Sequence, residues 1–289
     1  MSRLFNRLGI KAQLGLLLGV LAITVAIAAA AVGHSLVIGQ ALNESRSVAD
    51  MAEHIGAWGS RYGGVSVKLQ GLDPAKAGTY LEQRLYASGD KDLQHLSGVQ
   101  VADRKLDAEA LKRMDAYYSK NPALIQREVA DISAASGRRT RFRITAKSVI
   151  NQGNAPNEFE IEALNALQDG NRREYFSVKG TQMMYARSMV ATAACLKCHA
   201  SQSTTPGYIK ANAAYSGGGG FGYVEGKPAG VIAVYVSMMP TAQAAANSLS
   251  PAAWASLAAV LMVILMLVWF VARKVVTPAS KAGGKPSTF

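Results

Sequence analysis

The sequence predicts an α+β domain carried between two transmembrane helices. Two uncharged runs, residues 12–32 and 252–272, are each 21 residues long. At 1.5 Å per residue each run spans about 30 Å, the thickness of the hydrocarbon core of a bilayer. Between the runs, helical patterns come first and strand patterns follow, which is the order expected for an α+β domain with an antiparallel sheet.

The flanks of the two runs predict the topology. Residues 1–11 and 273–289 contain Lys and Arg but no acid, and basic flanks of this kind stay on the cytoplasmic side. We therefore expect two short cytoplasmic tails, an anchor in a bacterial inner membrane, and a periplasmic domain over residues 33–251. A cleaved signal peptide is the alternative for the first run, because the alanines at 28–31 suit a cleavage site.

The net charge of +12 does not predict binding to nucleic acid. Seven basic residues lie in the two tails, which leaves 24 basic against 19 acidic residues between them, a mild excess. The apolar content of 49% excludes a disordered chain, and two cysteines in 289 residues exclude a disulfide scaffold. We expect the membrane and another protein as partners, and a homodimer stays open.

Helical patterns continue beyond the first run. Residues 36–62 extend that helix, and their spacing places four side chains on one face: His54, Trp58, Arg61 and Tyr62. Gly63 and Gly64 end the helix, and Val65 and Val67 begin an extended segment. Further helices are predicted at residues 107–118, 122–132 and 158–167, the last with Asn157 as its N-cap.

Strand patterns dominate the later part of the domain. In residues 140–145, Thr140, Phe142 and Ile144 alternate with Arg141, Arg143 and Thr145, which predicts a strand. Residues 174–179 and 182–190 predict a hairpin around Gly180. The Val- and Ile-rich stretch 231–238 predicts a strand that leads toward the second apolar run, and residues 216–220 predict a flexible loop.

The segment Cys195-Leu196-Lys197-Cys198-His199 carries the chemistry. C-x-x-C-H is the attachment signature of c-type haem, in which the two thiols bind the porphyrin covalently and the adjacent His ligates the iron. The predicted export of the domain agrees independently, because such haem is attached outside the cytoplasm in bacteria. One motif predicts one covalent haem c.

Three other readings of the motif are weaker. A thioredoxin-like dithiol does not need the His and sits in a βαβ unit, which the sequence does not predict. A structural zinc site needs four ligands, and His34, His54 and His95 are the other histidines that remain. A disulfide between such near neighbours closes almost no loop.

Several segments around the motif resemble a known family. The quoted elements are, in chain order, WGSRYGGVSV at 58–67, NPALIQRE at 121–128, RIT at 143–145, NAPNEFE at 154–160, EYF at 174–176 and ACLKCHA at 194–200. Together they resemble the Tll0287-like haem-binding domain, also called domain of unknown function 3365. The resemblance implies a PAS-like fold with one c-type haem, a domain often found as the extracytoplasmic sensor of histidine kinases and chemoreceptors.

Two features depart from that family. In the segment 222–234 the glycines hold, but Lys227 stands where the family has an acid and Ala229 where it has Arg. Residues 275–278 look like the start of a HAMP linker, and 11 residues follow them. We therefore expect any signal to pass to a separate protein.

The residues around the iron are predicted less directly. His54 is the first candidate for the distal ligand, Met184 or its neighbour Met183 the alternative, and Tyr62 a rarer one; an empty site stays open. His95 lies in a polar stretch and His34 at the membrane edge. Arg143 and Arg187 are candidates to pair with the haem propionates, although strand arginines are as often simply solvated.

Two functions suit one haem outside the cytoplasm. The first is a haem-based sensor of redox state or of a diatomic gas, with the strand at 231–238 passing the change to the second apolar run. The second is an electron-transfer cytochrome subunit of a membrane complex. An enzyme is not expected, because no catalytic constellation accompanies the motif.

Overall fold

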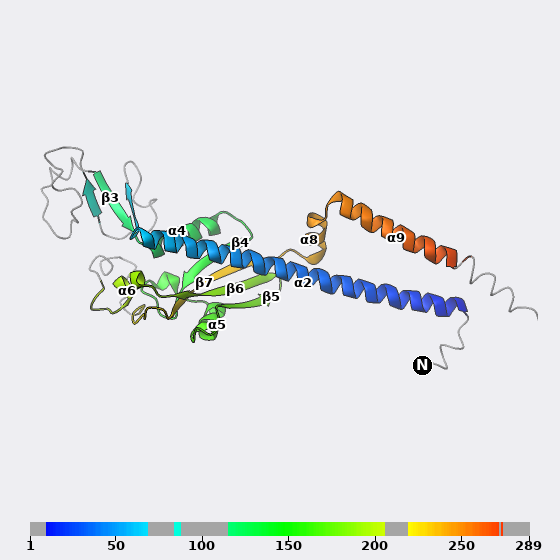
Figure 1. Ribbon diagram of the computed structural model, residues 1–289, viewed down its shortest axis with the longest axis horizontal. Coiled ribbons are helices and arrows are strands. Elements are labelled where there is room, and N and C mark those ends of the chain that lie inside the picture. Colours follow the sequence, from blue (N-terminus) through cyan, green and yellow to red (C-terminus); the bar gives the residue numbers. More distant parts are fainter. Residues whose placement is uncertain (1–9, 69–83, 88–114, 206–218, 272, 274–289) are drawn as a thin grey trace, which may run out of the picture. The chain divides into compact units, whose positions relative to one another are not determined.

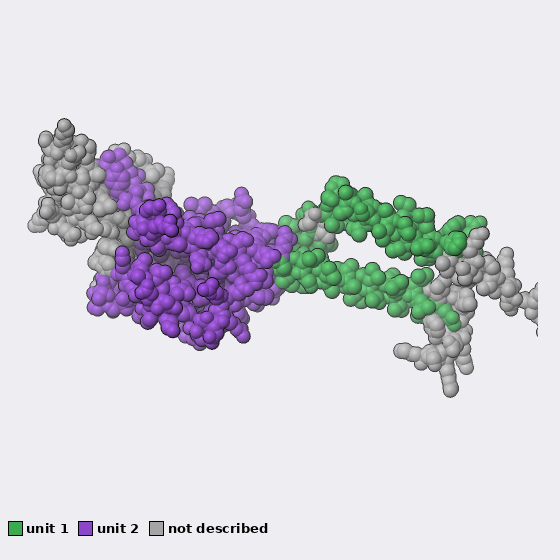
Figure 2. Space-filling model, viewed as in Figure 1, with its two compact units in different colours: residues 1–39, 239–289 green, residues 40–238 purple. Residues whose placement is uncertain are grey.

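The computed structural model describes residues 10–68, 84–87, 115–205, 219–271 and 273 (Figure 1). The chain divides into two compact units, one of residues 1–39 with 239–289 and one of residues 40–238 (Figure 2). The long helix α2, Ile10–Arg61, contributes residues to both units.

The first unit contains the apolar helices. Within the described residues, the two helices long and apolar enough to cross a membrane are Gly15–Arg61 and Pro251–Phe270, and the apolar window of each is 0% buried. An exposed apolar surface of this size is what a bilayer covers. The second of these helices is α9, Pro251–Val271, and the short helix α8, Thr241–Ser248, precedes it.

The second unit is built on a four-stranded antiparallel sheet. Its strand order is β4-β7-β6-β5. The strands are β4 Thr140–Thr145, β5 Glu174–Lys179, β6 Gln182–Val190 and β7 Pro228–Ser237. The register is irregular between Met189 and Val190, at the end of β6. The predicted α+β class and all four predicted strands are confirmed.

Helices cover both faces of this sheet. On one face, α5 (Glu158–Leu167) packs Phe159, Ala163 and Leu167 against Ala186 of β6 and against alternate side chains of β7. On the other face lies α2 (Figure 1). Ion pairs join this helix to the sheet edge and to β6, Arg46 with Glu174 and Asp50 with Arg187. Because β7 is a central strand with both faces covered, its residues 230–236 are buried throughout.

Small residues on α2 permit close packing of the helix. The buried positions of this helix recur every three or four residues, at Ala41, Ser45, Ala49, Ala52, Gly56 and Gly59. A Cβ on Gly56 would lie 2.2 Å from Nε2 of Gln126, which belongs to helix α4 (Pro122–Ala135) and donates a 2.7 Å hydrogen bond to the carbonyl of Ala52. Glycine at this position therefore lets the two helices touch.

A second, three-stranded sheet corrects one prediction. Its strands are β1 Val65–Lys68, β2 Arg84–Ala87 and β3 Asp115–Lys120, in the order β1-β3-β2. The helix predicted at 107–118 is wrong over 115–118, and its first residues lie outside the described part of the chain. Pairing on both sides of β3, together with the β-favouring Tyr117 and Tyr118, outweighs the local helical pattern.

The other helix predictions are confirmed. The first apolar run continues without a break to Arg61, where Gly63 with a φ of 71° ends the helix. Helix α5 has the predicted bounds, and Asn157 and Glu160 form a reciprocal capping box at its start. Four short described elements were not predicted. They are the strand β2, the 3-10 turn η4, Gln152–Asn154, the helix α6, Ala193–His199, and the helix α8.

Candidate functional site

The C-x-x-C-H motif lies on the connection between two neighbouring strands. β6 ends at Val190 and β7 begins at Pro228, and α6 follows β6 almost directly. Two backbone hydrogen bonds of 2.9 Å close the base of this connection, from Ala191 N–H to the carbonyl of Lys227 and from Gly226 N–H to the carbonyl of Ala191. The motif is thus anchored to two adjacent inner strands of the sheet.

Helix α6 brings the three motif residues together on two turns. Thr192 is its N-cap, and its carbonyl accepts a 2.9 Å hydrogen bond from Cys195 N–H. Cys195 and Cys198 are three residues apart and therefore share a side of the helix, with His199 adjacent. All three side chains are half-buried.

His199 is held by a backbone carbonyl. Its Nδ1 lies 2.5 Å from the carbonyl oxygen of Gly220. A carbonyl can only accept, so Nδ1 donates, and in a neutral imidazole this leaves a lone pair on Nε2. Burial lowers the pKa of His199, an effect that the hydrogen bond to Gly220 opposes. The ring is therefore kept neutral, in the tautomer that a metal at Nε2 requires.

Tyr223 stacks on the same imidazole. The two ring centroids are 4.6 Å apart and the ring planes differ by 8°. Tyr223 N–H also donates to the carbonyl of His199 at 3.2 Å, so the residue contacts both the ring and the backbone of the histidine. Burial raises the pKa of Tyr223 to about 12, with a smaller contribution from Cys195, and the phenol stays neutral.

The thiol of Cys198 differs from that of a redox-active dithiol. Cys195 Sγ accepts from Thr192 N–H at 3.4 Å and lies 3.3 Å from Thr192 Oγ1. Burial raises the pKa of Cys198, and Cys195 raises it further, whereas reactive dithiols have lowered values. Two thiols on one helical side, beside an imidazole whose Nε2 keeps its lone pair, fit the three attachment points of a c-type haem.

The distal-ligand candidates lie on different elements. His54 is exposed on α2, and Tyr62 is 66% exposed just beyond the end of that helix, its ring 5.7 Å from the ring of Trp58. Met183 and Met184 are consecutive on β6, so they face opposite sides of the sheet: Met183 is fully buried, and Met184 packs against the cluster under α5. His34 lies on α2 in the first unit, and His95 lies outside the described residues.

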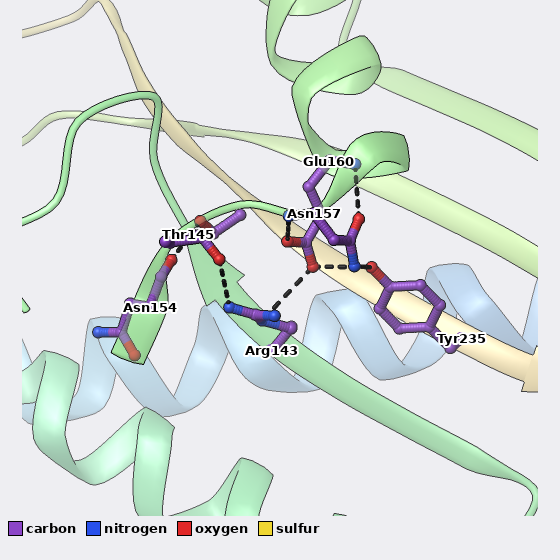
Figure 3. A network of polar contacts seen from close by, with 7 residues as sticks. Arg143, Thr145, Asn154, Asn157, Glu160 and Tyr235 are labelled. Atoms are coloured by element: carbon purple, nitrogen blue, oxygen red, sulfur yellow. Dashed lines mark hydrogen bonds and ion pairs between the residues drawn. The ribbon is translucent and has the colours of Figure 1, made fainter. Parts of the chain in front are cut away.

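The two arginines predicted to meet propionates have protein partners in the structure. Arg143 Nε lies 3.4 Å from the buried carboxylate of Glu160, and its guanidinium donates to the carbonyl of Ala155 at 2.9 Å (Figure 3). Arg187 pairs with Asp50 on α2 and donates from Nε to the hydroxyl of Tyr185 at 3.2 Å. Their pairing with haem propionates stays a prediction.

Sequence reasoning missed the residues that hold His199. Gly220 was included in a predicted flexible loop, but it is buried and supplies the carbonyl for Nδ1. Tyr223 appeared only within a quoted family segment, and Ser148 was not singled out. Each lies far from the motif along the chain, and no local pattern marks such a contact.

The comparisons with known proteins identify the family of the chain. The model of the Tll0287-like family matches residues 31–237, which is well over half of the chain and includes the complete motif. The chain belongs to the Tll0287-like family. The predicted resemblance is therefore confirmed, and the family match covers α5, the four-stranded sheet and α6 together.

Among solved structures, this Tll0287-like chain is similar to the crystal structure of the cyanobacterial haem-protein Tll0287. The two are 22% identical, and the match covers 42% of this chain and 74% of that chain with a TM-score of 0.38. No curated protein matches the chain.

Proposed function

We propose that this Tll0287-like protein is a membrane-anchored, periplasmic monohaem protein of the c type. Cys195 and Cys198 attach the haem, and His199 ligates its iron. The observation that carries the proposal is the state of His199, whose Nδ1 donates to the carbonyl of Gly220 while Nε2 keeps its lone pair. The haem-protein Tll0287 among the solved relatives supports the same cofactor.

The role that we propose is sensing of redox state or of a diatomic gas. Bound haem supplies a one-electron iron couple and an axial position for a small ligand. The chain's own contribution is the connection: β7 starts where the motif segment closes, at Pro228, and runs to Ser237, after which α8 and α9 follow. A movement of α6 therefore acts on a strand that is covalently continuous with the second apolar helix.

A second mechanical link supports this role. Arg187 lies on β6, the strand that leads into α6, and it pairs with Asp50 and Glu53 on α2. α2 is continuous with the first apolar helix. β7 is thus connected to α9 through the chain, and β6 is connected to α2 through ion pairs. A PAS-like sensor with two cytoplasmic ends would need such connections.

Covalent attachment is tested on the full chain, produced in a host that matures c-type cytochromes and purified in detergent. We expect haem to stay on the denatured protein in a gel, and to be lost in the variant Cys195→Ala/Cys198→Ala. Lys197→Ala is the matched control, since it changes an exposed residue of α6 and keeps C-x-x-C-H. Haem staining that survives in the double variant would exclude this attachment site.

The reduced optical spectrum before and after addition of CO separates gas sensing from redox sensing and electron transfer. A Soret band that shifts shows a displaceable distal position and favours a gas sensor. A spectrum that CO leaves unchanged favours redox sensing or electron transfer. His54→Ala and Met184→Leu then test the distal ligand, because loss of a ligand changes the oxidised spectrum and loss of a packing or surface side chain does not.

A further inference from the structure

The carbonyl that holds His199 is itself held by a second segment of the chain. Gly220 N–H donates a 2.9 Å hydrogen bond to Oγ of Ser148, which lies three residues after the end of β4. Gly220 therefore uses both of its backbone polar groups: its N–H donates to Ser148, and its carbonyl accepts from His199.

The segments around Ser148 and Gly220 are in tight contact. A Cβ on Gly219 would lie 2.1 Å from Oγ of Ser148, and a Cβ on Gly220 would lie 2.7 Å from both the backbone N and Cγ1 of Ile150. Gly220 also has a φ of 81°, which favours glycine. Both glycines are needed for the carbonyl of Gly220 to reach His199 from this position.

The Ser148 segment is anchored to the sheet. Thr145, at the end of β4, is buried and pairs with Val231 of β7, and its Oγ1 donates to the carbonyl of Asn154 at 2.6 Å. The loop from 146 to 154 is thereby fixed at both ends. The position of this loop sets the position of Gly220, and therefore the direction from which the carbonyl of Gly220 approaches His199.

We propose that Ser148 and Gly220 are positioning residues for His199, which fix its imidazole in the Nδ1–H tautomer and strengthen its donation to iron. The two tautomers of a neutral imidazole are selected by hydrogen bonding, so the acceptor at Gly220 decides which nitrogen is free. A hydrogen bond at Nδ1 also makes the ring a more basic ligand. The effect on iron rests on the proposed function; the effect on the tautomer does not.

The tautomer is tested in the haem-free chain, Cys195→Ala/Cys198→Ala, labelled with ¹⁵N-histidine. The chain has four histidines, so long-range ¹H–¹⁵N correlation spectra resolve them, and a His199→Asn spectrum assigns the signal. Burial lowers the pKa of His199 below the usual value, so its ring is neutral at about pH 8. We expect His199 to be the Nδ1–H tautomer, to shift toward Nε2–H in Ser148→Ala, and to stay Nδ1–H in Ser148→Thr, which keeps the hydroxyl.

Gly219→Ala gives a second route to the same result. The added methyl displaces the hydroxyl of Ser148 without removing it, so we expect the same shift of tautomer as in Ser148→Ala. If Ser148→Ala and Gly219→Ala both leave His199 in the Nδ1–H form, the positioning role is overturned.

The holoprotein tests the consequence for iron. A weaker hydrogen bond at Nδ1 makes His199 a poorer donor to ferric iron, so we expect a higher reduction potential in Ser148→Ala and an unchanged potential in Ser148→Thr. Gly222→Ala is the control for Gly220→Ala, because both glycines have a φ of 81° and a Cβ on Gly222 meets nothing within 4 Å. We expect a higher potential in Gly220→Ala than in Gly222→Ala. Equal potentials in all four variants would overturn the effect on iron.

The two failures are distinguishable. If the chain binds no haem, the proposed function fails, but the tautomer of the haem-free chain still decides whether Ser148 and Gly220 position His199. If haem binds and the tautomer is insensitive to Ser148, the proposed function stands and the positioning role fails.

Discussion

Two polar clusters adjoin β4, and they are built differently. The Glu160 cluster consists of Arg143, Thr145, Asn154, Asn157, Glu160 and Tyr235 (Figure 3). The His199 cluster consists of Ser148, His199, Gly220 and Tyr223. The first contains side chains of β4 itself, and the second is held by the loop that follows that strand.

In the Glu160 cluster, the charge and the hydrogen-bond acceptors of the buried carboxylate all have partners within the cluster. The carboxylate of Glu160 is 0% exposed, and it accepts from the hydroxyl of Tyr235 at 2.7 Å and from Asn157 N–H at 2.9 Å. Arg143 balances its charge, and Asn157 Nδ2 donates to the hydroxyl of Tyr235 at 2.6 Å. Burial raises the pKa of Tyr235, which remains a neutral donor.

The His199 cluster fixes the imidazole of His199 at Nδ1 and at one ring face. Nδ1 is engaged by Gly220 and the ring face by Tyr223, whereas Nε2 has no hydrogen bond to any residue that the structure describes. In a structural cluster the polar groups bind one another, because buried polar groups need hydrogen-bond partners. A ligand site instead orients a donor and leaves the donor atom for the ligand.

The largest expected effect breaks the Glu160 cluster. Glu160→Gln replaces a buried charged acceptor by an amide whose NH2 group cannot accept, so that it cannot accept from both Tyr235 and Asn157, and leaving a buried donor unpaired costs about 2 kcal/mol. Urea unfolding of the full chain in detergent, followed by circular dichroism, measures the loss. Glu158→Gln is the control, because Glu158 is an exposed acid in the same helical turn. A loss equal to that of the control would show that the cluster does not stabilise the fold.

A matched pair of substitutions sharpens the contrast between the clusters. Tyr235→Phe removes a hydroxyl that donates to Glu160 and accepts from Asn157, so we expect a loss of about 1.5 kcal/mol in the free energy of unfolding. Tyr223→Phe keeps the ring that stacks on His199 and is expected to change stability by less than about 0.5 kcal/mol. The same unfolding assay compares them, and equal losses would contradict the distinction.

The smallest effect concerns an ion pair that is partly open to solvent. The hydrogen bond from Arg46 lowers the pKa of Glu174 below its usual 4.5, burial opposes this, and the hydroxyl of Tyr185 adds to it. A lowered carboxyl pKa stabilises the fold above pH 4.5, and this stability is lost as the pH falls through the lower folded value. Because the side chain of Glu174 is 33% exposed, solvent screening limits the contribution to about 1 kcal/mol.

Unfolding at pH 7 and at a pH below 4.5 measures this contribution. We expect Arg46→Ala to reduce the difference in stability between the two pH values and Arg46→Lys to preserve part of it. An unchanged difference in Arg46→Ala would assign the pH dependence to other carboxylates.

Much of the sheet and its helices was predictable because the signals are local. The bounds of α5 follow from its N-cap at Asn157 and its apolar spacing, and those of the β5–β6 hairpin follow from Gly180, which has a φ of 61°. The segment 115–118 was mispredicted because its partners, β1 and β2, lie elsewhere in the sequence. Pairing with distant segments decided the structure of β3, and the local pattern does not show which segments will pair with it.

By itself, the sequence determined the candidate ligand atoms and the runs that suit a membrane. Two thiols and an imidazole in C-x-x-C-H, and two apolar runs of sufficient length, are properties of neighbouring residues. Only the tertiary structure decided the state of those atoms. The tautomer of His199 depends on the carbonyl of Gly220, 21 residues later, and that carbonyl depends on the hydroxyl of Ser148, 72 residues before Gly220. Hydrogen bonds act over about 3 Å in space whatever their separation in sequence, so folding had to bring these groups together.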